Sequence, residues 1–262
     1  KDPIYAFVDI ETTGSRANLD RITEVGVLTL ENQESSEWSR LINPGVHIPN
    51  NIQKLTGITP AMVSTKPSFD EIAAELYLEL KDKIFIAHNA RFDYSFLKAE
   101  FKRVGIDFSP KVVCTVKLSR RLFPSQGRHN LDTLIYVHGL VVQSRHRALD
   151  DAKLLYQFWQ RCETLFGQDK LLTEIEYLLG RPSLPPHIDR ELIDELPNRP
   201  GVYLFYAENK QPLYIGKSND LRSRVMGHFQ SALSNRKEMK LSLQVRGIDW
   251  IETGGELGAL LL

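Results

Sequence analysis

Two carboxylates stand one residue apart, directly behind an apolar segment near the start of the sequence. Asp9 and Glu11 follow the run Ile4–Val8, whose β-branched and aromatic residues are typical of a buried strand. Side chains alternate along a strand, so both carboxylates leave it on the same side. A divalent cation removes their mutual repulsion and the cost of burying them, and hard oxygen ligands suit Mg²⁺ or Mn²⁺. Taken alone, the pair also fits a strand that ends in a polar turn.

Two later segments add groups suited to the same chemistry. The segment His88–Asp93 follows the short apolar run Ile84–Ala87 and leads into Tyr94–Phe101, whose apolar spacing is helical. Far downstream, His146–Asp151 opens another helix. Together the three segments favour a functional site over a polar turn.

In this order the three motifs resemble those of the DEDDh 3′→5′ exonucleases, the DnaQ-like family. The family pattern, D-x-E, then the Asp of H-N-x-x-F-D, then H-x-x-x-x-D, falls on five residues: Asp9, Glu11, Asp93, His146 and Asp151. The spacing from the histidine selects Asp151 rather than its neighbour Asp150. The resemblance implies an α/β architecture of the RNase H-like type, with a mixed central sheet flanked by helices.

The resemblance also implies a mechanism with two Mg²⁺ or Mn²⁺ ions held by Asp9, Glu11, Asp93 and Asp151. Two ions about 3.5–4 Å apart can hold the attacking and leaving oxygens of an in-line displacement. We expect Asp9 to bridge both ions, Glu11 and Asp151 to bind one, and Asp93 to bind the outer one. His146 would accept the proton of the attacking water, because an imidazole with a pKa of about 6.5 suits that task. The expected product is a nucleoside 5′-monophosphate released from a 3′ end.

Substrate contacts are expected from two regions. The segment Ile52–Ile58 resembles the family segment that packs against the terminal nucleotide, which makes Leu55 and Thr56 candidate contacts; the alternative is a short structural helix. The resemblance also implies contacts from residues beside the carboxylate motifs: Thr12, Thr13, Gly14, His88, Asn89 and Phe92.

The elements that must position these groups are readable from local signals. Residues 21–30 and 37–42 predict a hairpin that completes the sheet. A capping box formed by Ser68 and Glu71 opens a helix toward Leu80, and Asn130 is typical of a helix cap. Further helices are predicted over 114–123, 147–166 and 170–179. Arg120 and Arg121 in the first of these fit a phosphate contact or a solvated helix face.

A proline-rich stretch divides the chain into a first domain of residues 1–179, a linker over 180–199 and a second domain of residues 200–262. The linker is expected to be extended and semi-rigid, with a short helix over 188–196. The segments Pro200–Phe205 and Leu213–Lys217 predict two paired strands. They resemble the GIY-YIG nuclease fold, specifically the amino-terminal nuclease domain of the UvrC family, a small α/β domain. The motif residues fall on Tyr203, Tyr214, Gly216, Lys217, Arg224 and His228.

A tyrosine hydroxyl with an ordinary pKa of about 10 needs nearby cations to take a proton from water. Lys217, Arg224 and a bound metal would supply that positive field, whereas the alternative makes Tyr203 and Tyr214 ordinary strand aromatics. The UvrC-like pattern places its metal-binding glutamate directly after an apolar run, which here corresponds to the position after Leu262. Glu256 lies two helical turns before that position. We therefore expect this chain to be a piece of a longer protein whose GIY-YIG half is inactive as given, with a DNA-binding or structural role still open.

Composition is that of an ordinary globular protein, with 42% hydrophobic residues and a formal net charge of +0. A membrane span is not expected, and two cysteines without metal-ligand spacing indicate buried thiols of a reducing compartment, hence the cytoplasm. The leading hypothesis is an exonuclease acting on single-stranded or frayed DNA 3′ ends in repair or proofreading. RNA 3′ trimming and a scaffold with vestigial sites are the alternatives. A polymerase or sliding-clamp partner is not supported by a motif.

Overall fold

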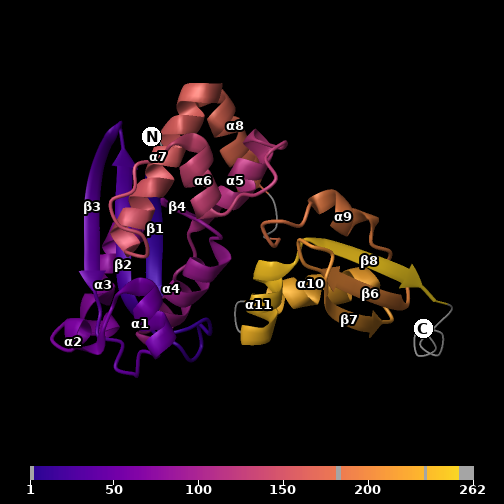
Figure 1. The fold of residues 1–262 in the computed structure, drawn as a ribbon, viewed down its shortest axis with the longest axis horizontal. Coiled ribbons are helices and arrows are strands. Elements are labelled where there is room, and N and C mark those ends of the chain that lie inside the picture. Colours follow the sequence, from indigo (N-terminus) through magenta and orange to yellow (C-terminus); the bar gives the residue numbers. More distant parts are fainter. Residues whose placement is uncertain (1–2, 181–183, 233–234, 254–262) are drawn as a thin grey trace. The chain divides into compact units, whose positions relative to one another are not determined.

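The computed structural model describes residues 3–180, 184–232 and 235–253. The chain divides into two compact units, Lys1–Arg181 and Pro182–Leu262. Figure 1 shows the helices and strands of both.

The first unit is built on a five-stranded sheet with the order β3-β2-β1-β4-β5. Strand β1 (Tyr5–Thr12) pairs antiparallel with β2 (Ile22–Glu31), which pairs antiparallel with β3 (Glu34–Leu41). Strands β4 (Ile84–Ala87) and β5 (Lys111–Cys114) run parallel to β1. The predicted mixed sheet is therefore confirmed, and the segments that follow the parallel strands β1 and β4 leave the same edge of the sheet.

Eight helices occur in the described part of this unit. They are α1 (Asn50–Thr56), α2 (Pro60–Val63), α3 (Phe69–Leu80), α4 (Arg91–Arg103), α5 (Thr115–Leu122), α6 (Leu131–His138), α7 (Ala148–Phe166) and α8 (Gln168–Leu179). Helices α3 and α4 pack on one face of the sheet and α7 on the other (Figure 1).

The alternation of β1 assigns its residues to these two faces. Ala6, Val8 and Ile10 belong to the core that contains α3 and α4, whereas Tyr5 and Phe7 belong to the core that contains α7 and α8. The odd-numbered residues of β1 thus face α7. Asp9 and Glu11 continue this odd-numbered series.

Local signals in the sequence located several helix ends correctly. The capping box is formed, with the Ser68 amide donating to Glu71 Oε2 at 2.8 Å, and the Asn130 side chain accepts from the Thr133 amide at 2.8 Å. The predicted helix over 114–123 begins one residue later, because Cys114 still pairs with Ala87 in the sheet. Both cysteines are free and buried, as predicted.

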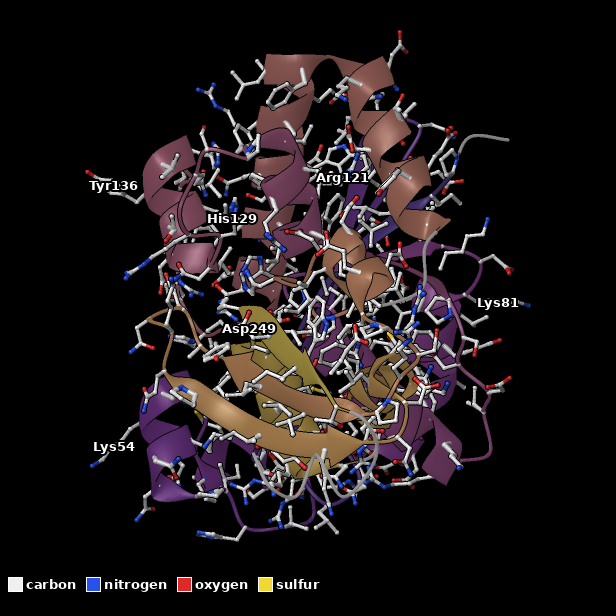
Figure 2. All side chains as sticks on the ribbon, turned by 90° about the vertical axis from the view of Figure 1, so that its right-hand side faces the viewer. Lys54, Lys81, Arg121, His129, Tyr136 and Asp249 are labelled. Atoms are coloured by element: carbon white, nitrogen blue, oxygen red, sulfur yellow. The ribbon has the colours of Figure 1, made fainter. Side chains whose placement is uncertain are left out.

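Arg121 makes contacts within the protein that its position in the sequence did not indicate. Its guanidinium pairs with the buried carboxylate of Glu174 on α8 and lies 3.6 Å from the ring centroid of Tyr177, between α5 and α8 (Figure 2). Arg121 therefore joins two of the protein's own helices while its side chain remains partly exposed.

The second unit contains a three-stranded antiparallel sheet with the order β7-β6-β8. Its strands are β6 (Gly201–Tyr206), β7 (Pro212–Ser218) and β8 (Gly247–Glu252), and its helices are α9 (Arg190–Glu195), α10 (Leu221–Ser231) and α11 (Arg236–Gln244). The predicted pairing of the two strands around Tyr203 and Tyr214 is confirmed.

The predicted linker is different in the structure. Leu184, Ile188, Ile193 and Leu196 are buried in the same core as Tyr203. Burial of these apolar side chains is more favourable than their exposure to water in an extended linker would be. Most of the stretch 180–199 is consequently part of the second unit. Within the described residues, every helix is too short or too polar to cross a membrane.

Candidate functional site

Gly26 of β2 determines how closely α7 approaches the first carboxylate motif. It lies directly opposite Asp9 in the β1–β2 ladder. A Cβ atom at this position would overlap backbone atoms of Ala148 and Leu149 in the first turn of α7. Only glycine therefore lets the amino-terminal turn of α7 rest on the strand beside Asp9.

Glu24 fastens the same helix end. Its buried carboxylate accepts hydrogen bonds from Arg147 Nη2 at 2.7 Å, from Arg147 Nε at 3.1 Å and from the Ala148 amide at 3.0 Å. Helix α7 has no side-chain cap from its own N-cap residue. Glu24 thus satisfies an amide of the first turn and fixes the two residues that follow His146.

These contacts bring two of the sequence motifs together. Ligand atoms of Glu11, His146 and Asp151 all lie within 4.8 Å of one another. His146 adopts a left-handed backbone conformation with φ +58°, which is uncommon for a residue with a side chain. The loop before α7 is therefore held in a defined and disfavoured shape at the site.

Asp93 reaches the site from the other motif. It lies in the first turn of α4, is 3% exposed, and accepts hydrogen bonds from the backbone amides of Asp93 itself and Ile10. The negative charges of Asp93, Asp151 and Glu11 all act on Asp9. The structure thus gathers all four predicted carboxylates around the carboxyl end of β1.

The pKa values of these carboxyl groups show the electrostatic strain of the cluster. Burial, followed by repulsion from the other carboxylates, raises the pKa of Asp9 well above its ordinary value, and burial does the same to Asp93. Burial and the charges of Asp151 and Glu24 raise the pKa of Glu11 to about 8. The pKa of Asp151 is raised by burial, although Arg145 opposes this shift.

A divalent cation fits this set of donors. Asp151 Oδ1 is buried and has no hydrogen-bond partner among the described residues, and a carboxylate oxygen is a hard donor. Positive charge placed among the four carboxylates would offset both their desolvation and their repulsion.

The hydroxyls of the predicted substrate contacts also make hydrogen bonds within the protein. Thr12 donates to the Gly14 carbonyl at 2.6 Å, and Thr13 Oγ1 accepts from the Arg21 amide at 3.0 Å. Thr56 is buried, donates to the Ile52 carbonyl and accepts from the Ile58 amide. Leu55, by contrast, is 54% exposed.

The remaining predicted contacts surround the second motif. His88 Nδ1 lies 2.9 Å from Thr115 Oγ1, and burial lowers the pKa of His88 to about 4, so its imidazole is neutral. Asn89 has a left-handed backbone with φ +62°, and the Phe92 ring packs 4.9 Å from that of Phe96. Gly14 allows the Asp20 carboxylate to approach the backbone closely.

Sequence reasoning missed four supporting residues: Glu24, Gly26, Asp132 and Arg145. A glycine inside an apolar strand, and an acidic residue two positions before it, were available signals for the first two. Arg145 carried a weaker signal, since it directly precedes the motif histidine. Its guanidinium contacts both Asp132 and Asp151.

The second unit contains a separate buried cluster around Tyr203. The Tyr203 hydroxyl lies 2.5 Å from His228 Nε2, and His228 Nδ1 lies 2.7 Å from Glu238 Oε2. Burial raises the pKa of Tyr203 to about 12, and a hydrogen bond with Arg224 opposes this shift. Tyr214, whose ring centroid is 6.0 Å from that of Tyr203, adds to the rise in pKa. Four predicted residues are thus brought together, and Glu238 joins them.

Gly216 and Lys217 lie on opposite faces of this sheet. Gly216 pairs with Tyr203, and a Cβ atom there would overlap the tyrosine ring, which explains the glycine. Lys217 pairs with Val202, whose side chain leaves the other face, and it is exposed. The structure therefore places Lys217 away from the Tyr203 cluster. Glu256 lies outside the described residues.

Comparisons with known proteins match both units to known families. The exonuclease family model of the RNase T type matches residues 6–158, and the model of the UvrC-like GIY-YIG domain matches residues 199–262. A Mycobacterium tuberculosis protein named as a bifunctional exonuclease/endonuclease is 32% identical over 271 aligned positions, covering 99% of this chain and 42% of the relative. A Staphylococcus haemolyticus protein named 3′-5′ exonuclease DinG is 37% identical over 167 residues, covering 62% of this chain and 19% of the relative. This chain thus spans less than half the length of either relative.

Solved structures support the fold. Exonuclease X in complex with 5′ overhanging duplex DNA gives a TM-score of 0.52 at 24% identity, covering 65% of this chain and 99% of that one. Escherichia coli exonuclease I in complex with a dA16 oligonucleotide gives a TM-score of 0.60 at 17% identity, covering 78% of this chain and 48% of that one. The predicted RNase H-like fold is confirmed. The chain belongs to the exonuclease family, and its exonuclease domain is followed by a UvrC-like GIY-YIG domain.

Proposed function

We propose that the first unit is a 3′→5′ exonuclease that releases nucleoside 5′-monophosphates from DNA 3′ ends with two Mg²⁺ or Mn²⁺ ions. The observation that carries this proposal is the convergence of four carboxylates with raised pKa values beside His146. The names of the DinG relatives support the 3′→5′ direction, and the titles of the exonuclease X and exonuclease I structures support DNA as substrate.

The residues that would hold the cations are Asp9, Glu11, Asp93 and Asp151. When bound, the cations supply positive charge that stabilises the phosphate and the leaving oxygen during displacement. His146 accepts the proton of the attacking water, and Glu24 keeps the helix beside it in place through Arg147. His88 is neutral at physiological pH, so it adds no charge to the group of carboxylates.

For the second unit we propose a nucleic-acid incision chemistry, favoured by the hydrogen-bonded series Tyr203, His228 and Glu238. His228 takes the proton of the Tyr203 hydroxyl, and Glu238 stabilises the imidazolium that forms. The resulting phenolate accepts the proton of the water that attacks the phosphate and displaces the leaving oxygen. Arg224 lowers the cost of the phenolate by its positive charge. An incision domain joined to an exonuclease suits a role in DNA repair or proofreading.

The test compares matched 5′-labelled single-stranded DNA and RNA, with Mg²⁺ or Mn²⁺, on the wild-type chain and on Asp9→Ala. A one-nucleotide ladder on DNA that disappears in Asp9→Ala is the expected result. A ladder mainly on RNA would show that the first unit trims RNA 3′ ends instead. Trimming that persists in Asp9→Ala would place the site elsewhere, and internal cuts that persist there would be assigned to the second unit.

A further inference from the structure

Arg145 joins two carboxylates that belong to different helices. Its Nη2 and Nε atoms lie 3.0 Å and 3.2 Å from Asp132 Oδ1 in the first turn of α6, and its Nη1 contacts Asp151 Oδ2 on α7. One planar guanidinium thus connects an outer and an inner acidic residue.

The two oxygens of Asp151 are used differently. Oδ2 accepts from Arg145, whereas Oδ1 is buried and unpartnered within the described part of the chain. A carboxylate that is held by hydrogen bonds cannot rotate freely, so the contact with Arg145, together with a hydrogen bond from the His146 backbone, fixes the direction of Oδ1. That atom belongs to the carboxylate that lies within 4.8 Å of ligand atoms of Glu11 and His146.

The exposed fraction of the side chain increases from Asp151 through Arg145 to Asp132. The Asp151 side chain is 6% exposed, that of Arg145 is 24% exposed and that of Asp132 is 81% exposed. An exposed pair such as Asp132–Arg145 adds little to folding stability, so stability does not account for the arrangement. Arg145 also precedes His146, while Arg147 on the other side is held by Glu24. The left-handed residue His146 is thereby anchored on both sides.

We propose that Arg145, steadied by Asp132, is a positioning residue that aims Oδ1 of Asp151 at the divalent cation of the site. This inference rests on the cation site of the proposed function. It makes a prediction opposite to that of simple electrostatics. A positive charge near the cations should weaken their binding, whereas an orienting partner of a ligand should strengthen it, and loss of such a partner typically weakens metal affinity by about 10–100-fold.

The experiment measures Mn²⁺ affinity on the whole chain without nucleic acid, by calorimetry and by electron paramagnetic resonance of free Mn²⁺. Arg145→Ala is expected to raise the Kd by about tenfold or more. Arg145→Lys keeps the positive charge but loses the planar guanidinium, so its Mn²⁺ affinity should fall nearly as much as that of Arg145→Ala. The Mn²⁺ affinity of Asp132→Asn should fall less. Arg40→Ala, which removes an arginine bonded to Glu75 on the protein surface, serves as the matched control and should bind as the wild type does.

Several results would overturn the positioning role. Unchanged or tighter Mn²⁺ binding in Arg145→Ala would assign Arg145 to charge or structure alone, and wild-type affinity in Arg145→Lys would exclude a role for the fork. If Arg145→Ala does not fold, as judged by circular dichroism, the Mn²⁺ affinities of Arg145→Lys and Asp132→Asn test the positioning role in its place. If Asp151→Asn leaves Mn²⁺ binding unchanged, Asp151 is not a ligand of the cation and the positioning role of Arg145 is excluded. Normal Mn²⁺ behaviour without DNA cleavage would instead contradict the proposed function and leave the role of Arg145 standing.

Discussion

Gly26 lies opposite Asp9 in the β1–β2 ladder, and the absence of a side chain at Gly26 lets the first turn of α7 reach the sheet. Gly26→Ala would drive a Cβ atom into the backbone of Ala148 and Leu149, which cannot yield as a flexible side chain would. We expect a loss of about 1–3 kcal/mol in the free energy of unfolding, measured with urea, together with weaker Mn²⁺ binding. Gly127→Ala is the control, because a Cβ there meets no atom within 4 Å. Equal effects of the two substitutions would contradict the role of Gly26.

His146 is both a candidate proton acceptor and a candidate ligand, since it lies within the group formed with Glu11 and Asp151. We expect His146→Ala to lower the rate of single-turnover DNA cleavage by about 10²–10⁴-fold, because the general base is lost, while Mn²⁺ affinity stays nearly unchanged. A large fall in Mn²⁺ affinity would identify His146 as a ligand. A wild-type rate would remove it from the mechanism.

The raised pKa of Glu11 predicts how stability depends on pH in EDTA. Burial and neighbouring carboxylates raise the pKa from 4.5 to about 8, so between these values the folded protein binds more protons than the unfolded chain. Stability should therefore fall as pH rises from about 4.5 toward about 8. Thermal unfolding across this range should show a shallower decline for Glu11→Gln, and Mg²⁺ should restore stability mainly at the alkaline end. A flat wild-type profile would contradict the electrostatic account of the cluster.

The Tyr203 cluster predicts a specific tautomer of His228. Because Glu238 accepts from Nδ1–H, Nε2 is left as the acceptor for the Tyr203 hydroxyl. Nitrogen-15 NMR at neutral pH should show Nδ1 protonated and Nε2 unprotonated, and Glu238→Ala should move His228 toward a mixture of tautomers. Lys217→Ala is the control, because Lys217 leaves the opposite face of the sheet. A protonated Nε2 in the wild type would contradict the proposed direction of proton transfer.

The sequence alone determined the features that depend on neighbours along the chain. Strand alternation put Asp9 and Glu11 on one face, and the caps at Ser68 and Asn130 were correct because they join residues three positions apart. The spacing from His146 to Asp151 spans little more than one helical turn, and the paired strands around Tyr203 are joined by a short turn.

The tertiary structure decided whatever depends on packing between segments remote in sequence. The Glu24–Arg147 pair and the link from Asp132 through Arg145 to Asp151 exist only because strand register and helix packing bring these residues together. The face on which Lys217 lies followed from its pairing with Val202 in the β6–β7 ladder. Burial of Leu184 and Ile188 turned an expected linker into core, because apolar side chains bury wherever a neighbouring surface accepts them. Motif spacing therefore identified the reacting groups, and three-dimensional packing determined the residues that hold them in place.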